Sequence, residues 1–243
     1  MFKKFTNGCV RVVNRWLPDA FLFAIILTLI VFVAAMCATG MGPIAIIAKW
    51  GDQKGGFWNL LAFSMQMALV LVFGSAMASA KPCKKALRTV AGLCHNEKQA
   101  ILVTTFVSTL CCWLNWGFGL VIGALLAKEV VRRVPAVDYP LLIASAYSGF
   151  VIWHAGLSGS IPLDLVAGKA FGEVTYQAPI TETVFHPVNL IMCGVILVLM
   201  PFVNYAMHPE KDRTVTVNPA LLVDEAEKEY PLDTPAEKLE HSK

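Results

Sequence analysis

QAILVTTFVSTLCCWLNWGFGLVIGALLA, residues 99–127, contains no Asp, Glu, Lys or Arg, yet Asn115, Gly117 and Gly119 interrupt its middle. A transmembrane helix needs about 20 mainly apolar residues, so this stretch is long enough to enter a bilayer. Backbone that leaves a helix at membrane depth is tolerated only where protein covers it or a cavity hydrates it, and transporters use such breaks as substrate and ion sites. The stretch therefore makes transport the first functional hypothesis.

The composition of the whole chain supports a membrane protein. Of its 243 residues, 56% are hydrophobic and 15% charged, and the mean hydropathy is +0.61, beyond the range of ordinary soluble domains. The net charge of +3 is small, so no nucleic-acid partner is expected. The cysteines form no C-x-x-C pair, and no phosphate loop, H-E-x-x-H motif or serine elbow is present. We therefore expect no cofactor, no metal site and no enzymatic activity.

Windows free of charged residues mark the expected membrane spans. They predict an all-α integral membrane protein with about four transmembrane helices plus a re-entrant or broken helical hairpin. Residues 206–243 are polar and contain several prolines, as expected of a cytoplasmic tail or linker. A transmembrane domain is expected over 1–205, with spans near 20–39 and 57–80, a hairpin at 101–131, a broken helix at 139–160 and a last span at 188–205.

The distribution of lysine and arginine predicts the orientation of these spans. Basic residues precede the first span and follow the second, which places the amino terminus in the cytoplasm. Lys128, Arg132 and Arg133 directly follow the interrupted stretch. A single crossing there would put this basic cluster outside, whereas a re-entrant hairpin with its tip at 115–119 keeps both flanks cytoplasmic. We therefore favour the hairpin, with the carboxyl-terminal tail also cytoplasmic.

A second interruption follows the window 139–153, where the sequence continues as HAGLSGS, residues 154–160. A helix over 139–153 would be roughly 22 Å long at about 1.5 Å per residue, short of the roughly 30 Å hydrocarbon core. The second break should therefore begin inside the membrane.

The tip of the hairpin carries the first group of candidate binding residues. Gly117 and Gly119 permit close backbone approach, and a helix that starts near Phe118 would point free N–H groups at the tip, which suits a carboxylate. Asn115 can offer a carbonyl to Na⁺ or an amide to an anion, and Trp113 and Trp116 could line a short acyl chain. The alternative is a packing kink, because glycines also allow membrane helices to pack closely.

The second break supplies the other candidates. Ser158, Gly159 and Ser160 offer hydroxyls and backbone amides for an anion or Na⁺, although an external turn is an equal alternative. The imidazole of His154 could relay a coupling proton, although a histidine hydrogen-bonded at a helix end is the more common case. Trp153 precedes it and could extend the aromatic wall.

Taken together, the motifs resemble those of the bacterial short-chain fatty acid transporter family. The resemblance covers nearly the whole apolar part of the chain, in family order. The matching stretches are RWLPD at 15–19, WGD at 50–52, GFWNLLAFxMQMAL at 56–69, NWGFGLVxGA at 115–124, RRVPxxDYPLLIA at 132–144 and SGSxPL at 158–163.

The resemblance implies a multi-pass inner-membrane permease for short-chain fatty acids such as acetoacetate or butyrate, often encoded with enzymes that activate these acids to CoA esters. Family members are about twice as long, so the chain corresponds to the amino-terminal half of a two-part transporter fold. The leading hypothesis is an H⁺- or Na⁺-coupled secondary carrier, with His154 or Asn115 serving the coupling ion. The alternative is a truncated half or a membrane subunit that needs a second polypeptide to supply the missing half.

Overall fold

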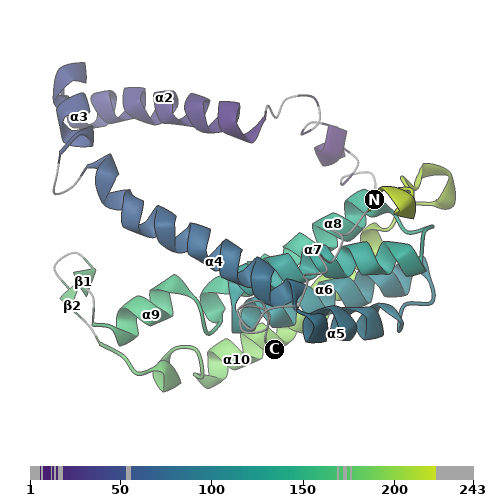
Figure 1. The fold of residues 1–243 in the computed structure, drawn as a ribbon. Helices are drawn as coiled ribbons and strands as arrows, with labels where there is room; N and C mark the ends of the chain where they lie inside the picture. The colour runs from purple at the N-terminus through teal and green to yellow at the C-terminus, as the bar shows by residue number, and fades with distance from the viewer. Residues whose placement is uncertain are drawn as a thin grey trace, which may run out of the picture.

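The computed structural model describes residues 6, 8–11, 13, 15, 19–52, 56–168, 170–171, 174–175 and 177–222 (Figure 1). Of the predicted tail over 206–243, residues 223–243 lie outside this described part. The elements are α2 Ala20–Thr39, α3 Pro43–Trp50, η1 Phe57–Leu60, α4 Leu61–Ser79, α5 Lys81–Ala91, α6 Glu97–Leu114, α7 Trp116–Arg133, α8 Tyr139–Ser148, η2 Gly149–Ala155, α9 Ser160–Val166, β1 Ala170–Phe171, β2 Val174–Thr175, η3 Ile180–Glu182, α10 Pro187–Met207, η4 Lys211–Arg213 and η5 Pro219–Leu221.

Four helical segments are long and apolar enough to cross a membrane, which confirms the predicted all-α membrane protein. Within the described residues, the only sheet is a two-residue antiparallel pairing of β1 with β2 in the loop after α9. The four candidate spans are Phe21–Thr39, Phe57–Met77, Tyr139–Val166 and Pro187–Met207.

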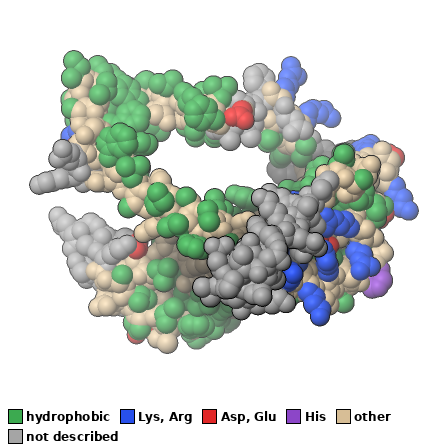
Figure 2. Space-filling model, viewed as in Figure 1, with side chains coloured by type: hydrophobic (Ala, Val, Ile, Leu, Met, Phe, Trp, Pro, Cys, Tyr) green, Lys and Arg blue, Asp and Glu red, His purple; other side chains and the backbone are tan. Residues whose placement is uncertain are grey.

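Helix α2 forms an arm with α3 that stands away from the other helices, and α4 leads back to them (Figure 1). The side chain of Asp19 caps the start of α2 by accepting the Phe21 N–H at 2.9 Å. Gly40 ends the helix in the left-handed conformation, with φ 67°, which glycine adopts without steric cost. Figure 2 shows apolar side chains over this arm, and the apolar window of α2 is 0% buried. Such a helix needs lipid or another protein around it.

Helices α6 and α7 form an antiparallel hairpin at the centre of the bundle, joined by Asn115 alone. Helix α5 packs on α7, α10 packs on α6, and α8 contacts both arms (Figure 1). The two helices therefore form a helical hairpin whose flanks lie at the same end of the bundle, and its re-entry from one side of the membrane stays a prediction. Its largest core cluster is apolar and includes Ile101, Leu126, Val130 and Leu142, each completely buried.

A buried polar stripe runs along α6 beside this core. The side chains of this stripe are 0% exposed: Thr104, Thr105, Ser108 and Thr109. Asn204 of α10 donates hydrogen bonds to Thr105 Oγ1 at 3.0 Å and to Ser148 Oγ at 2.8 Å. Ser108 donates to the backbone oxygen of Ala146. Bonds of this kind join helices in membranes, where apolar contact alone gives little preference for protein over lipid.

The chain after α10 returns over the end of the hairpin where its flanks meet. Asp138 caps α8 by accepting the Leu141 N–H at 2.9 Å, and its second oxygen accepts the Val215 N–H at 2.9 Å. Arg132 donates to the carbonyl of Leu222 at 2.7 Å. These contacts hold the first part of the predicted tail against the bundle.

Candidate functional site

Asn115 forms the first break as a single non-helical residue between α6 and α7. Its backbone is extended, with φ −152° and ψ 117°. Asn115 is therefore both the C-cap of α6 and the N-cap of α7. Its N–H donates to the carbonyl of Cys111 at 2.9 Å, and its side-chain oxygen accepts the Phe118 N–H at 2.9 Å. Asparagine suits this position because its short carbonyl can reach the N–H three residues ahead.

The second break lies between η2 and α9, at 156–159. Helix α8 tightens into the 3₁₀ segment Gly149–Ala155, and Gly156 then leaves the helix with φ −97° and ψ 176°. Gly159 donates its N–H to the carbonyl of Gly156 at 3.1 Å before α9 starts at Ser160. A chain that enters as a helix therefore leaves its hydrogen-bond ladder for a few residues and resumes it.

Two hydrogen bonds join the two breaks, although they are far apart in sequence. Leu157 donates its N–H to the carbonyl of Trp113 at 2.8 Å, and Trp116 donates its N–H to Ser158 Oγ at 3.0 Å. The end of α6 and the start of α7 thus each receive a partner from the second break. The structure brings the sequence-predicted groups at both breaks into one site.

Most backbone N–H groups in the first turn of α7 already donate hydrogen bonds within the protein. Fewer N–H groups are therefore free at the hairpin tip than the sequence led us to expect. Trp116 donates to Ser158, Phe118 donates to the Asn115 side chain, and Gly119 donates to the Asn115 carbonyl at 2.8 Å. Among the described residues, Gly117 is the first-turn amide of α7 for which no acceptor is found. A ligand would therefore find at most one unpaired amide in this turn, that of the buried Gly117, unless Ser158 moved away.

The glycines of the site are positions of close packing. A Cβ on Gly117 would lie 2.0 Å from Val70 Cγ1 of α4, and a Cβ on Gly119 would lie 2.4 Å from the backbone nitrogen of Cys112. At Gly156 the nearest atom would be the carbonyl oxygen of Trp113, at 2.4 Å. The packing explanation for these glycines therefore accounts for their positions, and it is compatible with a binding role for the neighbouring polar groups.

An aromatic cluster lies beside the joined breaks. The ring centroids of Trp116 and Trp153 are 5.1 Å apart, and Phe150 stacks on Trp153 at 4.8 Å. The His154 ring also stacks on Trp153, with the two ring centroids 4.3 Å apart. Trp113 lies apart from them, edge-on to Phe185 at 6.3 Å. Two of the three predicted tryptophans thus form one wall, and the third packs elsewhere.

Exposure divides the candidate residues into three groups. Asn115, His154 and Ser160 are exposed, whereas the glycines are buried and Ser158, Trp113, Trp116 and Trp153 are half-buried. Neither 113–119 nor 153–160 contains Asp, Glu, Lys or Arg. In the described part of the chain, no group of three or more His, Cys, Asp or Glu side chains could hold a metal ion. The accessible chemistry is therefore that of neutral hydrogen-bond donors, hydroxyls and one imidazole.

Sequence reasoning missed two supports of the site, Phe150 and Asn189. Asn189 donates from Nδ2 to the carbonyl of Ala155 at 2.9 Å and to that of Val184 at 2.8 Å, so it holds the end of η2 against the start of α10. Its signal was an amide inside the apolar window of the last span. Phe150 gave no signal, because an aromatic residue in an apolar span is ordinary.

Fold and site together define a multi-pass helical membrane protein in which two helix breaks meet. The model of the family described as "Short chain fatty acid transporter" matches residues 1–243, and the chain belongs to this family. The family description is that of a transporter rather than an enzyme.

Two curated relatives carry the provisional name of short-chain fatty acid transporter. One, from Escherichia coli (strain K12), is 44% identical over 247 residues, and one, from Haemophilus influenzae (strain ATCC 51907 / DSM 11121 / KW20 / Rd), is 37% identical over 254 residues. Each alignment covers 100% of this chain and 56% of the relative, so the chain spans about half the length of these relatives. No solved structure matches the chain.

Proposed function

We propose that this chain forms part of a secondary carrier that moves a short-chain monocarboxylate, such as acetoacetate or butyrate, across the bacterial inner membrane. The observation that carries the proposal is the hydrogen-bonded meeting of two helix breaks, Trp116 N–H to Ser158 Oγ and Leu157 N–H to Trp113 O. Broken helices at membrane depth are the usual binding elements of secondary transporters. The family of the chain supports the substrate class.

The carboxylate binds at the neutral donors of the two breaks. Asn115 commits its side-chain oxygen to Phe118, which leaves its exposed amide nitrogen to donate to an anion. The Ser158 and Ser160 hydroxyls and the Gly117 amide are further donors, and the positive end of the α7 dipole adds to them. A single negative charge held without a basic side chain can leave again, as transport requires.

The aromatic wall receives the acyl chain. Trp116 and Trp153 present their rings beside the joined breaks, and Phe150 extends the same surface. Trp113 acts as a positioning residue, because its carbonyl anchors Leu157 while its ring packs on Phe185. Gly119 and Gly159 hold the backbones close enough for this arrangement.

Transport is coupled to H⁺ or Na⁺ at the same end of the hairpin. His154 is exposed and stacked on Trp153, where a protonated imidazole would attract the carboxylate. Asn115 is the alternative ligand, for Na⁺. Uptake in the presence of an imposed pH gradient, compared with uptake under an imposed sodium gradient, separates the two ions.

The amino terminus and the carboxyl-terminal tail lie in the cytoplasm. The basic residues that flank the hairpin gather at one end of the bundle, where Figure 2 shows Lys and Arg side chains together. Cytoplasmic segments are enriched in lysine and arginine, which supports this orientation.

Uptake of labelled butyrate by cells that produce a functional assembly tests the assignment. Asn115→Leu should abolish uptake at wild-type expression, whereas Gly119→Leu should abolish uptake together with a loss of stability, because its Cβ would lie 2.4 Å from the Cys112 backbone nitrogen. Asn218→Leu is the matched control, because Asn218 is an exposed asparagine that also accepts a backbone amide, that of Ala220 at 3.0 Å. Normal uptake by well-expressed Asn115→Leu and Gly119→Leu proteins would refute the assignment.

A second candidate function is a subunit that transports only with a partner polypeptide supplying a second half. The relatives extend well beyond the length that this chain matches, and the exposed α2 arm could contact further protein. Butyrate uptake with and without coexpression of the matching second half separates the two candidates. Equal uptake in both cases would eliminate the partner hypothesis.

A further inference from the structure

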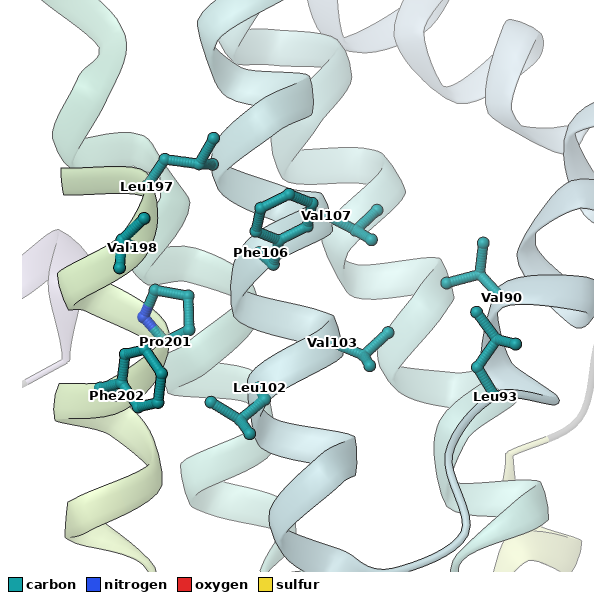
Figure 3. Close-up of a pocket in the computed structure, with 10 residues that line it drawn as sticks. All are labelled: Val90, Leu93, Leu102, Val103, Phe106, Val107, Leu197, Val198, Pro201 and Phe202. Atoms are coloured by element: carbon teal, nitrogen blue, oxygen red, sulfur yellow. The ribbon is translucent and has the colours of Figure 1, made fainter. Parts of the chain in front are cut away.

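An apolar groove runs between α5, α6 and α10, and its lining shares no residue with the aromatic wall of the substrate site. Figure 3 shows Pro201 and Phe202 of α10 next to Phe106 of α6, with Val90 of α5 and Leu93 of the following turn at the other side. The groove encloses about 470 Å³, and hydrophobic side chains form essentially all of its lining. It is large enough for a lipid chain and offers no polar anchor within its walls.

The groove lies at membrane depth, because α10 is one of the candidate spans. An apolar surface there gains little by exchanging one hydrocarbon neighbour for another, since lipid tails are as apolar as leucine. The walls therefore accept an acyl chain without choosing among lipids. Any choice has to come from a polar group at the end of the groove.

Lys98 and Tyr205 stand at one end of the groove. Lys98 lies one helical turn before Leu102 of α6, and Tyr205 lies one turn after Pro201 of α10. The Lys98 ammonium sits 5.2 Å from the centroid of the Tyr205 ring, a cation–π contact that joins the first turn of α6 to the last turn of α10. Lys98 is exposed, and no carboxylate of the described residues pairs with it.

The surrounding end of the bundle is basic. Arg88 and Arg132 share one carboxylate, Glu129, at 3.7 and 2.7 Å, whereas Lys84 and Lys85 have no ion pair among the described residues. Figure 2 shows the Lys and Arg side chains gathered over this end. Basic pockets between transmembrane helices attract anionic lipid headgroups.

We infer that the groove binds an anionic phospholipid, with one acyl chain between α6 and α10 and its phosphate on Lys98. The Tyr205 ring holds the ammonium in place for the phosphate. The site is separate from the substrate site and does not depend on which acid is transported, or on transport at all.

Photocrosslinking tests this site in the full chain reconstituted into bilayers. Phosphatidylglycerol and phosphatidylcholine carry the same diazirine acyl chain, and the lipid–peptide adducts are mapped by mass spectrometry. Adducts on the α6 and α10 peptides of the groove should be about fivefold more abundant with phosphatidylglycerol, the factor that one lysine contributes near an anionic lipid. Adducts on the α2 arm serve as an internal reference.

Three variants locate the selectivity. Lys98→Gln should remove the phosphatidylglycerol excess at the groove, whereas Lys85→Gln, which changes an exposed lysine of α5, should keep it. Val107→Trp should fill the groove and lower the adducts from both lipids relative to α2. If Val107→Trp fails to fold, Lys98→Gln still tests the headgroup preference, because Lys98 is exposed at the surface.

Three results would overturn the inference. Equal groove adducts from the two lipids in the wild-type chain would remove the headgroup preference, and an unchanged preference in Lys98→Gln would remove the role of Lys98. Labelling of α2 without groove adducts would mean that protein, rather than lipid, fills the groove.

Discussion

The hydroxyl of Ser158 accepts the N–H of Trp116 at 3.0 Å, across 42 positions of sequence. This bond gives the first amide of α7 its partner from the second helix break. Any movement of the 156–159 segment would therefore free an amide at the hairpin tip. The relationship ties the geometry of one break to the hydrogen-bonding capacity of the other.

Ser158→Ala should weaken both stability and uptake. The variant leaves the N–H of the half-buried Trp116 without its acceptor, and the loss of such a hydrogen bond costs about 0.5–1.5 kcal/mol. Thermal unfolding in detergent and labelled butyrate uptake measure the two effects. Thr39→Val is the control, because the Thr39 hydroxyl bonds only within its own helix and at its end. A Ser158→Ala protein with wild-type unfolding temperature and uptake would show that the bond between the breaks is dispensable.

Gly119→Ala and Gly156→Ala should each destabilise the protein by about 1–3 kcal/mol, the usual cost of overpacking. Their added Cβ atoms would lie 2.4 Å from backbone atoms of Cys112 and Trp113, which cannot move away as a flexible side chain could.

The matched control for these glycine variants is Gly194→Ala, since nothing lies within 4 Å of a Cβ at Gly194 in α10. Alanine favours a helix more than glycine does, so this variant should unfold at the same or a higher temperature. Thermal unfolding of the three proteins in the same detergent gives the comparison. Equal unfolding temperatures for Gly119→Ala and Gly194→Ala would contradict the close packing.

Topology reporters placed after Lys98 and after Arg133 should report the same side of the membrane. Helices α6 and α7 are antiparallel and joined by one residue, so these two positions lie at the same end of the hairpin. Because the basic flanks favour the inside, both reporters should give a cytoplasmic signal. A periplasmic signal after Arg133 alone would show that 99–127 crosses the membrane in the cell.

Cys94, in the turn between α5 and α6, should react slowly with a maleimide. Burial raises the pKa of its thiol, so at a given pH less of the reactive thiolate is present. Two proteins are compared, one that retains only Cys94 and one that retains only the exposed Cys9. The rate of labelling of the Cys94 protein should begin to rise at a higher pH than that of the Cys9 protein. Superimposable pH profiles for the two proteins would contradict the buried position of Cys94.

Much of the fold follows from local patterns. The charge-free windows predicted the long apolar helices, and the structure has α6 and α7 as a helical hairpin, whereas its position relative to the membrane remains a prediction. The position of the first break was also readable, because Asn115 is a strong capping residue next to glycines. The roles of the candidate residues in binding remain predictions.

The sequence by itself determined which segments are apolar enough to enter a membrane and where the hairpin is interrupted, because hydropathy, charge and capping act over a few neighbouring residues. Only the tertiary structure decided that Ser158 and Leu157 bond to the hairpin tip, that Gly117 keeps the open amide, and that Asn189 and Asn204 hold the helices together. The reason is that a hydrogen-bond partner is chosen by proximity in space, and these partners lie far apart along the chain.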